Sequence, residues 1–200
     1  LFEKWNQDSE YMRQLDLERD LYGFDPNQRR AALQGLYGLI QADEASIVPE
    51  LPITNLHCHT FCSFNAYGYS PSAFAWESKK RGLFAAGIVD FDVLHGAQEF
   101  HEACAILGLR GTAGIESRVF IPEWKDREIN SPKEPGIFYA MGVGFLRDAD
   151  PASQPGRVLR SMASMARKRN EAILERLNAF LQAVALNYEK DVLPLTPSGN

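Results

Sequence analysis

Two histidines separated by one residue, His57 and His59, are the side chains whose spacing most clearly suggests chemistry. They close the short apolar alternation Ile53 to His59, which predicts a β-strand. Residues two apart in a strand point to the same side, about 7 Å apart along the backbone, so both imidazoles would face one space. Imidazole nitrogens bind transition metals at about 2.0–2.1 Å. The spacing predicts part of a metal site, although two strand histidines that only pack or hydrogen-bond fit the same pattern.

Carboxylates stand at the ends of two further predicted strands. Asp90 and Asp92 close the apolar run Leu83 to Asp90, and Glu116 lies in a third strand over Arg110 to Ile121. In a β/α barrel the carboxyl ends of the strands meet at one rim, where active sites lie. Imidazole and carboxylate ligands together suit Zn, Mn or Fe, and Glu116 could bridge two ions. Asp90 and Asp92 could also be loop acids or a helix N-cap, and Glu116 a solvated strand residue.

Helical segments are predicted before the first strand and directly after it. Apolar residues at helical spacing within Glu3 to Leu21 and Asn27 to Ala42 predict an N-terminal helical extension. Ser70, Pro71 and Gly82 supply an N-cap, a first helical residue and a C-terminal stop for the first helix of a β/α pattern.

The rest of the chain alternates between strand and helix patterns. The predicted elements are a strand at Leu83 to Asp90, a helix at Gly96 to Leu107, strands at Arg110 to Ile121 and Ile137 to Phe145, and a long amphipathic helix at Arg157 to Ala185. Strands separated by single helices predict an α/β fold with a parallel sheet or a barrel. The polar segment Lys125 to Pro135 predicts a loop.

Composition excludes several classes of protein. The 200 residues carry 21 basic and 26 acidic side chains, a net charge of -5, which argues against nucleic acid as a primary partner. Three cysteines do not suit a secreted disulfide framework, so we expect a reducing, cytoplasmic compartment. No apolar run approaches the roughly 20 residues that cross a bilayer. The start without Met and the ending PLTPSGN suggest a piece of a longer chain.

Four motifs in order resemble the polymerase and histidinol phosphatase (PHP) family of metal-dependent hydrolases. They are NLHCHTFCS, YSP, KKRGLFAAGIVDFD and GIES, similar to the family's H-x-H-T-x-x-S, S-P, a strand ending in T-D-H-D, and G-x-E. The resemblance covers about Ile53 to Arg118. It implies a distorted seven-stranded (β/α) barrel of TIM-like type, up to three metal ions, phosphoester hydrolysis, His57 and His59 as ligands, and Glu116 as the bridging glutamate. We expect residues 1–50 to be the helical extension and residues 51–200 the first part of this barrel, continuing beyond residue 200.

The chain departs from the family pattern at two points. Phe91 stands where the family has a histidine in T-D-H-D, and Tyr139 occupies another position where relatives carry histidine. A phenyl ring cannot coordinate a metal, so we expect one or two divalent ions. Asp90 completes the predicted ligand set of His57, His59 and Glu116, and Asp92 is the candidate acid that protonates the leaving group.

The predicted function is metal-dependent hydrolysis of a small phosphorylated substrate. A degenerate barrel with a binding or structural role is one alternative, because Phe91 has replaced a ligand. An amidohydrolase is another, since those enzymes also begin with H-x-H, but the DFD and GIE motifs and the lack of a lysine in GIFYAMGVGF argue against it.

Several other reactive side chains have simpler interpretations. Cys58 and Cys62 could bind a soft metal but fit buried thiols better, because no second cysteine pair completes a zinc site. His95 and His101 fit packing or surface histidines. A basic cluster in the last predicted helix could hold a phosphate or an acidic partner, but fits a solvated helix face better; it consists of Arg157, Arg160, Arg167, Lys168 and Arg169.

Overall fold

The computed structural model describes residues 2–64 and 68–197, with side chains from residue 11 onward. The chain forms two compact units, Leu1–Arg147 and Asp148–Asn200. The predicted boundary near residue 50, and a barrel continuing past residue 200, stay predictions.

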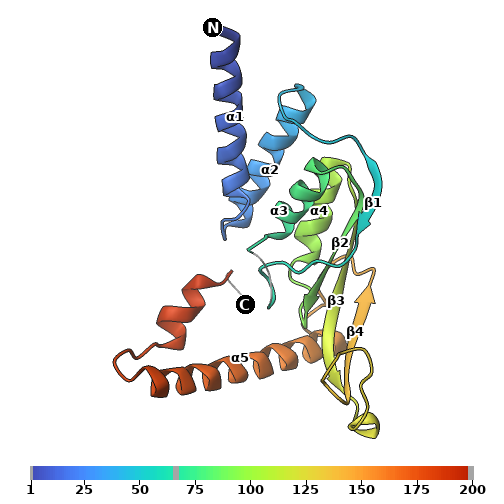
Figure 1. Ribbon diagram of the computed structural model, residues 1–200, viewed down its shortest axis with the longest axis vertical. Coiled ribbons are helices and arrows are strands. Elements are labelled where there is room, and N and C mark those ends of the chain that lie inside the picture. Colours follow the sequence, from blue (N-terminus) through green and yellow to red (C-terminus); the bar gives the residue numbers. More distant parts are fainter. Residues whose placement is uncertain (1, 65–67, 198–200) are drawn as a thin grey trace. The chain divides into compact units, whose positions relative to one another are not determined.

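A four-stranded sheet in the order β1-β2-β3-β4 organises the first unit (Figure 1). Its strands are β1 (Leu51–Asn55), β2 (Leu83–Phe91), β3 (Arg110–Phe120) and β4 (Ile137–Val143). The first three strands are parallel to one another, which confirms the α/β alternation. The fourth runs antiparallel to β3, which the alternation did not predict. As predicted, no α-helix lies between these two strands. Four strands are compatible with part of a barrel, and the full seven-stranded barrel stays a prediction.

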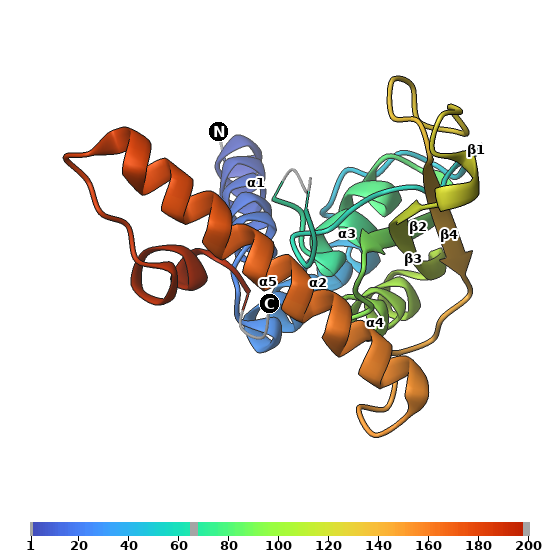
Figure 2. The same ribbon diagram turned by 90° about the horizontal axis from the view of Figure 1, so that it is seen from below.

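Two helices cover one face of this sheet, α3 (Pro71–Lys80) and α4 (Ala97–Leu107) (Figures 1 and 2). The predicted start of α3 is confirmed, since the Ser70 hydroxyl accepts a hydrogen bond from the Ala73 backbone at 2.9 Å. Its predicted stop is confirmed as well. Gly82 has φ +71, and a Cβ there would lie 2.3 Å from the Pro49 carbonyl oxygen, so both conformation and space require glycine.

The N-terminal helices share the core of the sheet and its helices. They are α1 (Phe2–Asp20) and α2 (Pro26–Gln41), close to the predicted boundaries. Apolar residues of α2 are buried in one cluster with residues of α3, α4, β2 and β3; its largest members include Leu33, Leu36, Leu39, Trp76, Ile88, Phe100 and Leu107. The helical extension is therefore part of the hydrophobic core of the first unit.

A buried arginine joins three of these helices. Arg29 on α2 donates from Nε to Glu99 Oε1 on α4 at 2.8 Å, pairs again through Nη2, and donates from Nη1 to the Gly23 carbonyl at 2.8 Å. Glu99 also accepts from the Ser72 hydroxyl at 2.8 Å, at the start of α3. The Arg29 side chain is only 5% exposed, so removing its partner would leave a charge without compensation.

The second unit is built around α5 (Gln154–Leu181), a single uninterrupted helix (Figure 2). It begins three residues before the predicted start and ends four before the predicted end. The Ser153 hydroxyl caps it by accepting from the Gly156 backbone at 3.1 Å. A π-helical turn (Tyr188–Val192) and a short 3-10 helix (Leu193–Leu195) follow. Among the described residues, none of the helices is both long and apolar enough for a bilayer.

We expect Arg29→Ala to lower the free energy of unfolding by about 3 kcal/mol, because Glu99 would remain partly buried without its cation. Urea denaturation of the full chain measures this. Arg30→Ala is the matched control: the neighbouring Arg30 pairs with Glu102 at 3.0 Å but is 60% exposed, so its loss should cost less than about 1 kcal/mol. Equal losses in the two variants would contradict the argument.

Candidate metal centre

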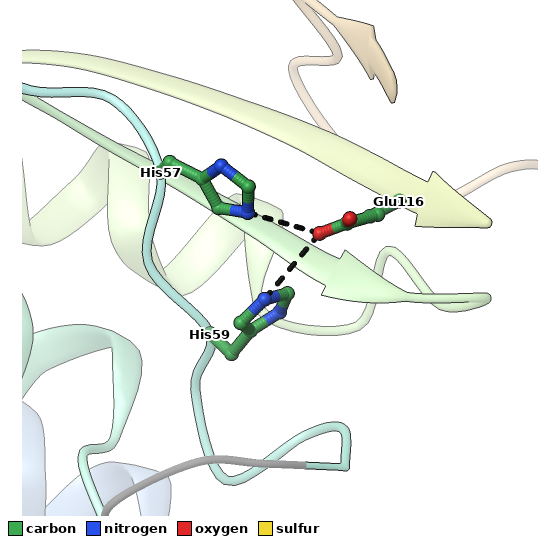
Figure 3. Close-up of side chains that lie close together, drawn as sticks. All are labelled: His57, His59 and Glu116. Carbon is green, nitrogen blue, oxygen red and sulfur yellow. Dashed lines mark hydrogen bonds and ion pairs between the residues drawn. The ribbon is translucent and has the colours of Figure 1, made fainter. Parts of the chain in front are cut away.

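Three predicted ligands converge in the structure. His57 Nε2 lies 3.0 Å and His59 Nε2 3.4 Å from the same oxygen, Glu116 Oε2 (Figure 3). One ligand atom from each residue lies within 4.8 Å of the others. The histidines follow β1 and the glutamate lies on β3, so the cluster forms across β2.

The histidines do not lie in the first strand, contrary to prediction. β1 ends at Asn55, and His57 and His59 occupy an irregular segment that stays beside β2 through the hydrogen bond from Val89 N to the Cys58 carbonyl, 2.8 Å. The Asn55 side chain accepts a hydrogen bond from the His57 backbone N–H at 3.1 Å. That N–H is therefore not available for pairing with a neighbouring strand. The shared orientation of the rings therefore comes from this loop rather than from strand alternation.

A glycine in β2 makes room for the loop. A Cβ on Gly87 would lie 3.0 Å from the Leu56 Cα atom and 2.9 Å from a Thr112 methyl carbon. The segment that leads into the histidines passes directly over this position. Gly87 is therefore required for close approach rather than for an unusual backbone conformation.

Strand alternation explains why Glu116 faces the histidines and Asp90 does not. Phe91 is paired with Glu116 in the β2–β3 register, so both project to the face opposite the helices, whereas Asp90, one residue earlier, projects toward the helices. Phe91 confirms this placement by stacking on His59, with ring centroids 4.5 Å apart and an interplanar angle of 9°. Phe91 thus packs against one of the candidate ligands.

The donor set fits a divalent metal. Ligand atoms about 2.0–2.1 Å from one ion lie roughly 3.0–3.4 Å apart in octahedral or tetrahedral geometry, which matches the two nitrogen–oxygen distances. The Nδ1 atom of His59, the ring nitrogen that does not face Glu116, is buried and has no hydrogen-bond partner among the described residues. Two imidazoles and one carboxylate suit Zn, Mn or Fe.

One side of the cluster is open. The side chains of Glu116 and His59 are 7% and 13% exposed, whereas that of His57 is 52% exposed. Glu116 closes the cluster on the side of the sheet, whereas His57 faces solvent. A further ligand could therefore approach from the side of His57. Catalytic metal sites, unlike structural ones, keep such an open position.

Asp90 holds the loop that follows the histidines. Its carboxylate accepts from the Thr60 backbone at 2.6 Å, the Thr60 hydroxyl at 2.7 Å and the Ser63 hydroxyl at 2.7 Å. Burial raises the pKa of Asp90, and these hydrogen bonds oppose the rise. Asp90 lies outside the three-residue cluster, and its role as a ligand stays a prediction. Thr60 and Ser63 belong to the H-x-H-T-x-x-S motif, but the motif does not predict that they are the partners of Asp90.

Asp92 lies beyond the end of β2, in a backbone conformation with φ +58. Its carboxylate accepts from the Ser117 hydroxyl at 2.7 Å, and its backbone N–H donates to the Glu116 carbonyl at 2.9 Å. It is not part of the cluster. Its role as an acid toward a leaving group stays a prediction.

The remaining candidates lie outside the cluster. Cys58 and Cys62 are free thiols, and burial raises their pKa values to about 11 and about 12, so both are protonated at neutral pH. Thiols in that state are poor metal ligands. His101 Nε2 is 2.8 Å from the Phe145 carbonyl oxygen. His95 is likewise not part of the three-residue group.

Comparison with known proteins supports the fold. No family model matches the chain, and no curated protein is significantly similar to it in sequence. A crystal structure of a Bifidobacterium adolescentis protein, whose name gives it provisionally as a metal-dependent phosphoesterase, matches with a TM-score of 0.52 and 21% identity. The match covers 71% of this chain and 43% of that one, so this chain spans less than half of that structure.

We expect His59→Ala and Glu116→Gln each to weaken Zn²⁺ binding by at least about tenfold, because each removes one of three ligands. Titration against a competing chelator measures the affinity in the full-length protein. His101→Gln is the control, since this histidine of the same unit lies outside the cluster and should leave the affinity unchanged. Unaltered affinity in both ligand variants would show that the cluster is not the metal site.

We expect Asp90→Asn to lower the free energy of unfolding by about 1–3 kcal/mol, because an amide cannot accept from three donors through one oxygen. Thermal or urea unfolding measures the loss. Asp92→Asn serves as the comparison, since Asp92 accepts one side-chain hydrogen bond and asparagine tolerates positive φ. A larger loss in Asp92→Asn than in Asp90→Asn would contradict this role for Asp90.

Proposed function

We propose that the protein is a metal-dependent hydrolase of phosphate esters, with His57, His59 and Glu116 as its metal ligands. The observation that carries the proposal is the convergence of two imidazoles and one carboxylate at distances suited to a shared ion. The similarity in fold to a protein named as a metal-dependent phosphoesterase supports the same class of reaction. Membership of the PHP family, and one or two ions of Zn, Mn or Fe, are part of this proposal.

A divalent ion in such a site supplies Lewis acidity and lowers the pKa of coordinated water, which provides a nucleophile at neutral pH. The protein contributes the arrangement of the ligands. Glu116 presents one buried carboxylate oxygen to both imidazoles, so negative charge is concentrated where a cation is needed. The exposed side of His57 leaves an approach for a small phosphorylated substrate.

Two further residues preorganise the site. Phe91 stacks on one face of the His59 ring, and this contact restricts the orientation of the ring. Asp90 anchors Thr60 and Ser63 and thereby holds the loop on the C-terminal side of the histidines. A loop that is already held in place loses less conformational entropy when it binds an ion or a substrate.

A non-catalytic barrel is the second candidate. It is favoured by the hydrogen-bond distance between His57 and Glu116, because a direct contact of 3.0 Å satisfies both groups without an ion. In that case the full-length protein would contain less than about one ion per chain at neutral pH. Metal analysis therefore separates the two candidates.

We expect His57→Ala in the full-length protein to reduce hydrolysis of phosphate monoesters or diesters by at least about 100-fold, because a ligand is lost. Chelation should abolish the wild-type activity, and added Zn²⁺ or Mn²⁺ should restore it. Full activity that survives both His57→Ala and chelation would reject the proposal. His101→Gln is again a suitable control, because His101 lies outside the cluster.

A further inference from the structure

An arginine shares the face of the sheet that carries Glu116. Arg118 follows two residues later on β3, and residues two apart in a strand project to the same side. Its direct cross-strand partner is Tyr139, whose ring lies 6.2 Å from that of Phe91. Phe91 in turn stacks on His59, so Arg118 and Tyr139 lie on the same face of the sheet as the candidate metal ligands.

The separation between Glu116 and Arg118 would allow both the candidate metal centre and the arginine to bind one small substrate. Residues two apart on a strand are about 7 Å apart along the backbone, a separation that an arginine side chain can span. Arg118 is placed beyond Phe91, the last residue of β2, so no β2 residue lies beside it in the register. Its side chain is 50% exposed. The guanidinium is therefore accessible to solvent. It lies beyond the end of β2, where only β3 and β4 continue the sheet.

Arg118 is held by a carboxylate rather than by the fold itself. Its Nη2 donates to Glu134 Oε1 at 2.6 Å, and the other Glu134 oxygen accepts from the Ser131 hydroxyl at 2.5 Å. The hydrogen bond from Ser131 and the guanidinium of Arg118 lower the pKa of Glu134, so its carboxylate is ionised at neutral pH. Glu134 lies in the loop between β3 and β4. This contact engages only part of the five-donor guanidinium fork.

We propose that Arg118 binds the anionic group of the substrate beside the metal centre, and that Glu134 competes for Arg118 when no substrate is bound. The inference rests on the proposed function and adds a substrate-binding residue to it. A guanidinium matches two phosphate oxygens with two parallel hydrogen bonds, a geometry that lysine cannot reproduce. Arg118 would pair with the Glu134 carboxylate in the free protein and with the substrate phosphate in the complex. Its positive charge is then compensated in both states.

A purely structural clasp of the β3–β4 hairpin is the alternative interpretation. The same strand offers a matched pair with that role: Arg110, at the other end of β3, donates to Glu50 at 2.8 Å and stacks over Phe84 at 4.1 Å. Arg110 and Arg118 are similarly exposed, 56% and 50%, and each pairs with one glutamate. Only Arg118 lies near the cluster.

The test uses inorganic phosphate as a probe of the metal-loaded, full-length protein, with calorimetry as a readout that needs no turnover. We expect Arg118→Ala to raise the Kd for phosphate about tenfold, and Arg118→Lys to recover part of that loss. Glu134→Gln should lower the Kd severalfold, because it removes the competitor. Arg110→Gln should leave it unchanged. With substrate, Arg118→Ala should raise KM while kcat changes little.

The opposite signs of the two effects distinguish substrate binding from a structural clasp. If Arg118→Ala leaves the Kd unchanged, or if Glu134→Gln weakens phosphate binding as Arg118→Ala does, the inference is wrong even when the wild type hydrolyses phosphate esters. A wild-type protein that binds no metal and hydrolyses no ester would instead reject the proposed function. Both pairs are exposed, so the variants should fold.

Discussion

The candidate site depends on a single carboxylate at a buried strand position. Glu116 is 5% exposed, and one of its oxygens lies within 3.4 Å of both imidazoles. A carboxylate taken this far out of water needs a cation or hydrogen-bond donors nearby. The two histidines meet this need, and their loop therefore lies next to Glu116 on β3. Its path across β2 is possible because Gly87 has no side chain.

Much of the framework could be predicted because local chemistry specifies it. Ser70 and Pro71 start α3, and Gly82 lies just past its end, because capping and positive φ are properties of the residues themselves. Strand direction has no such local signal. The polar sequence predicted the loop at Lys125 to Pro135, but nothing in it indicates that β4 runs antiparallel to β3.

The site was predictable in its members and less so in its geometry. His57, His59 and Glu116 were identified by type, spacing and motif, and the structure brings them together. The predicted strand does not extend to the histidines, because β1 ends at Asn55. The role of Asp90 as a fourth ligand stays a prediction, whereas its hydrogen bonds from Thr60 and Ser63 were not predicted. Side-chain partners of this kind depend on tertiary contacts between distant residues.

Because the cluster lies across β2, an ion bound there would be linked to the folding of the sheet. His57 and Glu116 are 59 residues apart, and their side chains meet only when the loop after β1 and the strand β3 both lie against β2. An unfolded chain offers these groups no common geometry, so any ion captured there favours the assembled sheet by mass action. Occupancy of the centre would then report on the integrity of three neighbouring strands as well as on the chemistry they support.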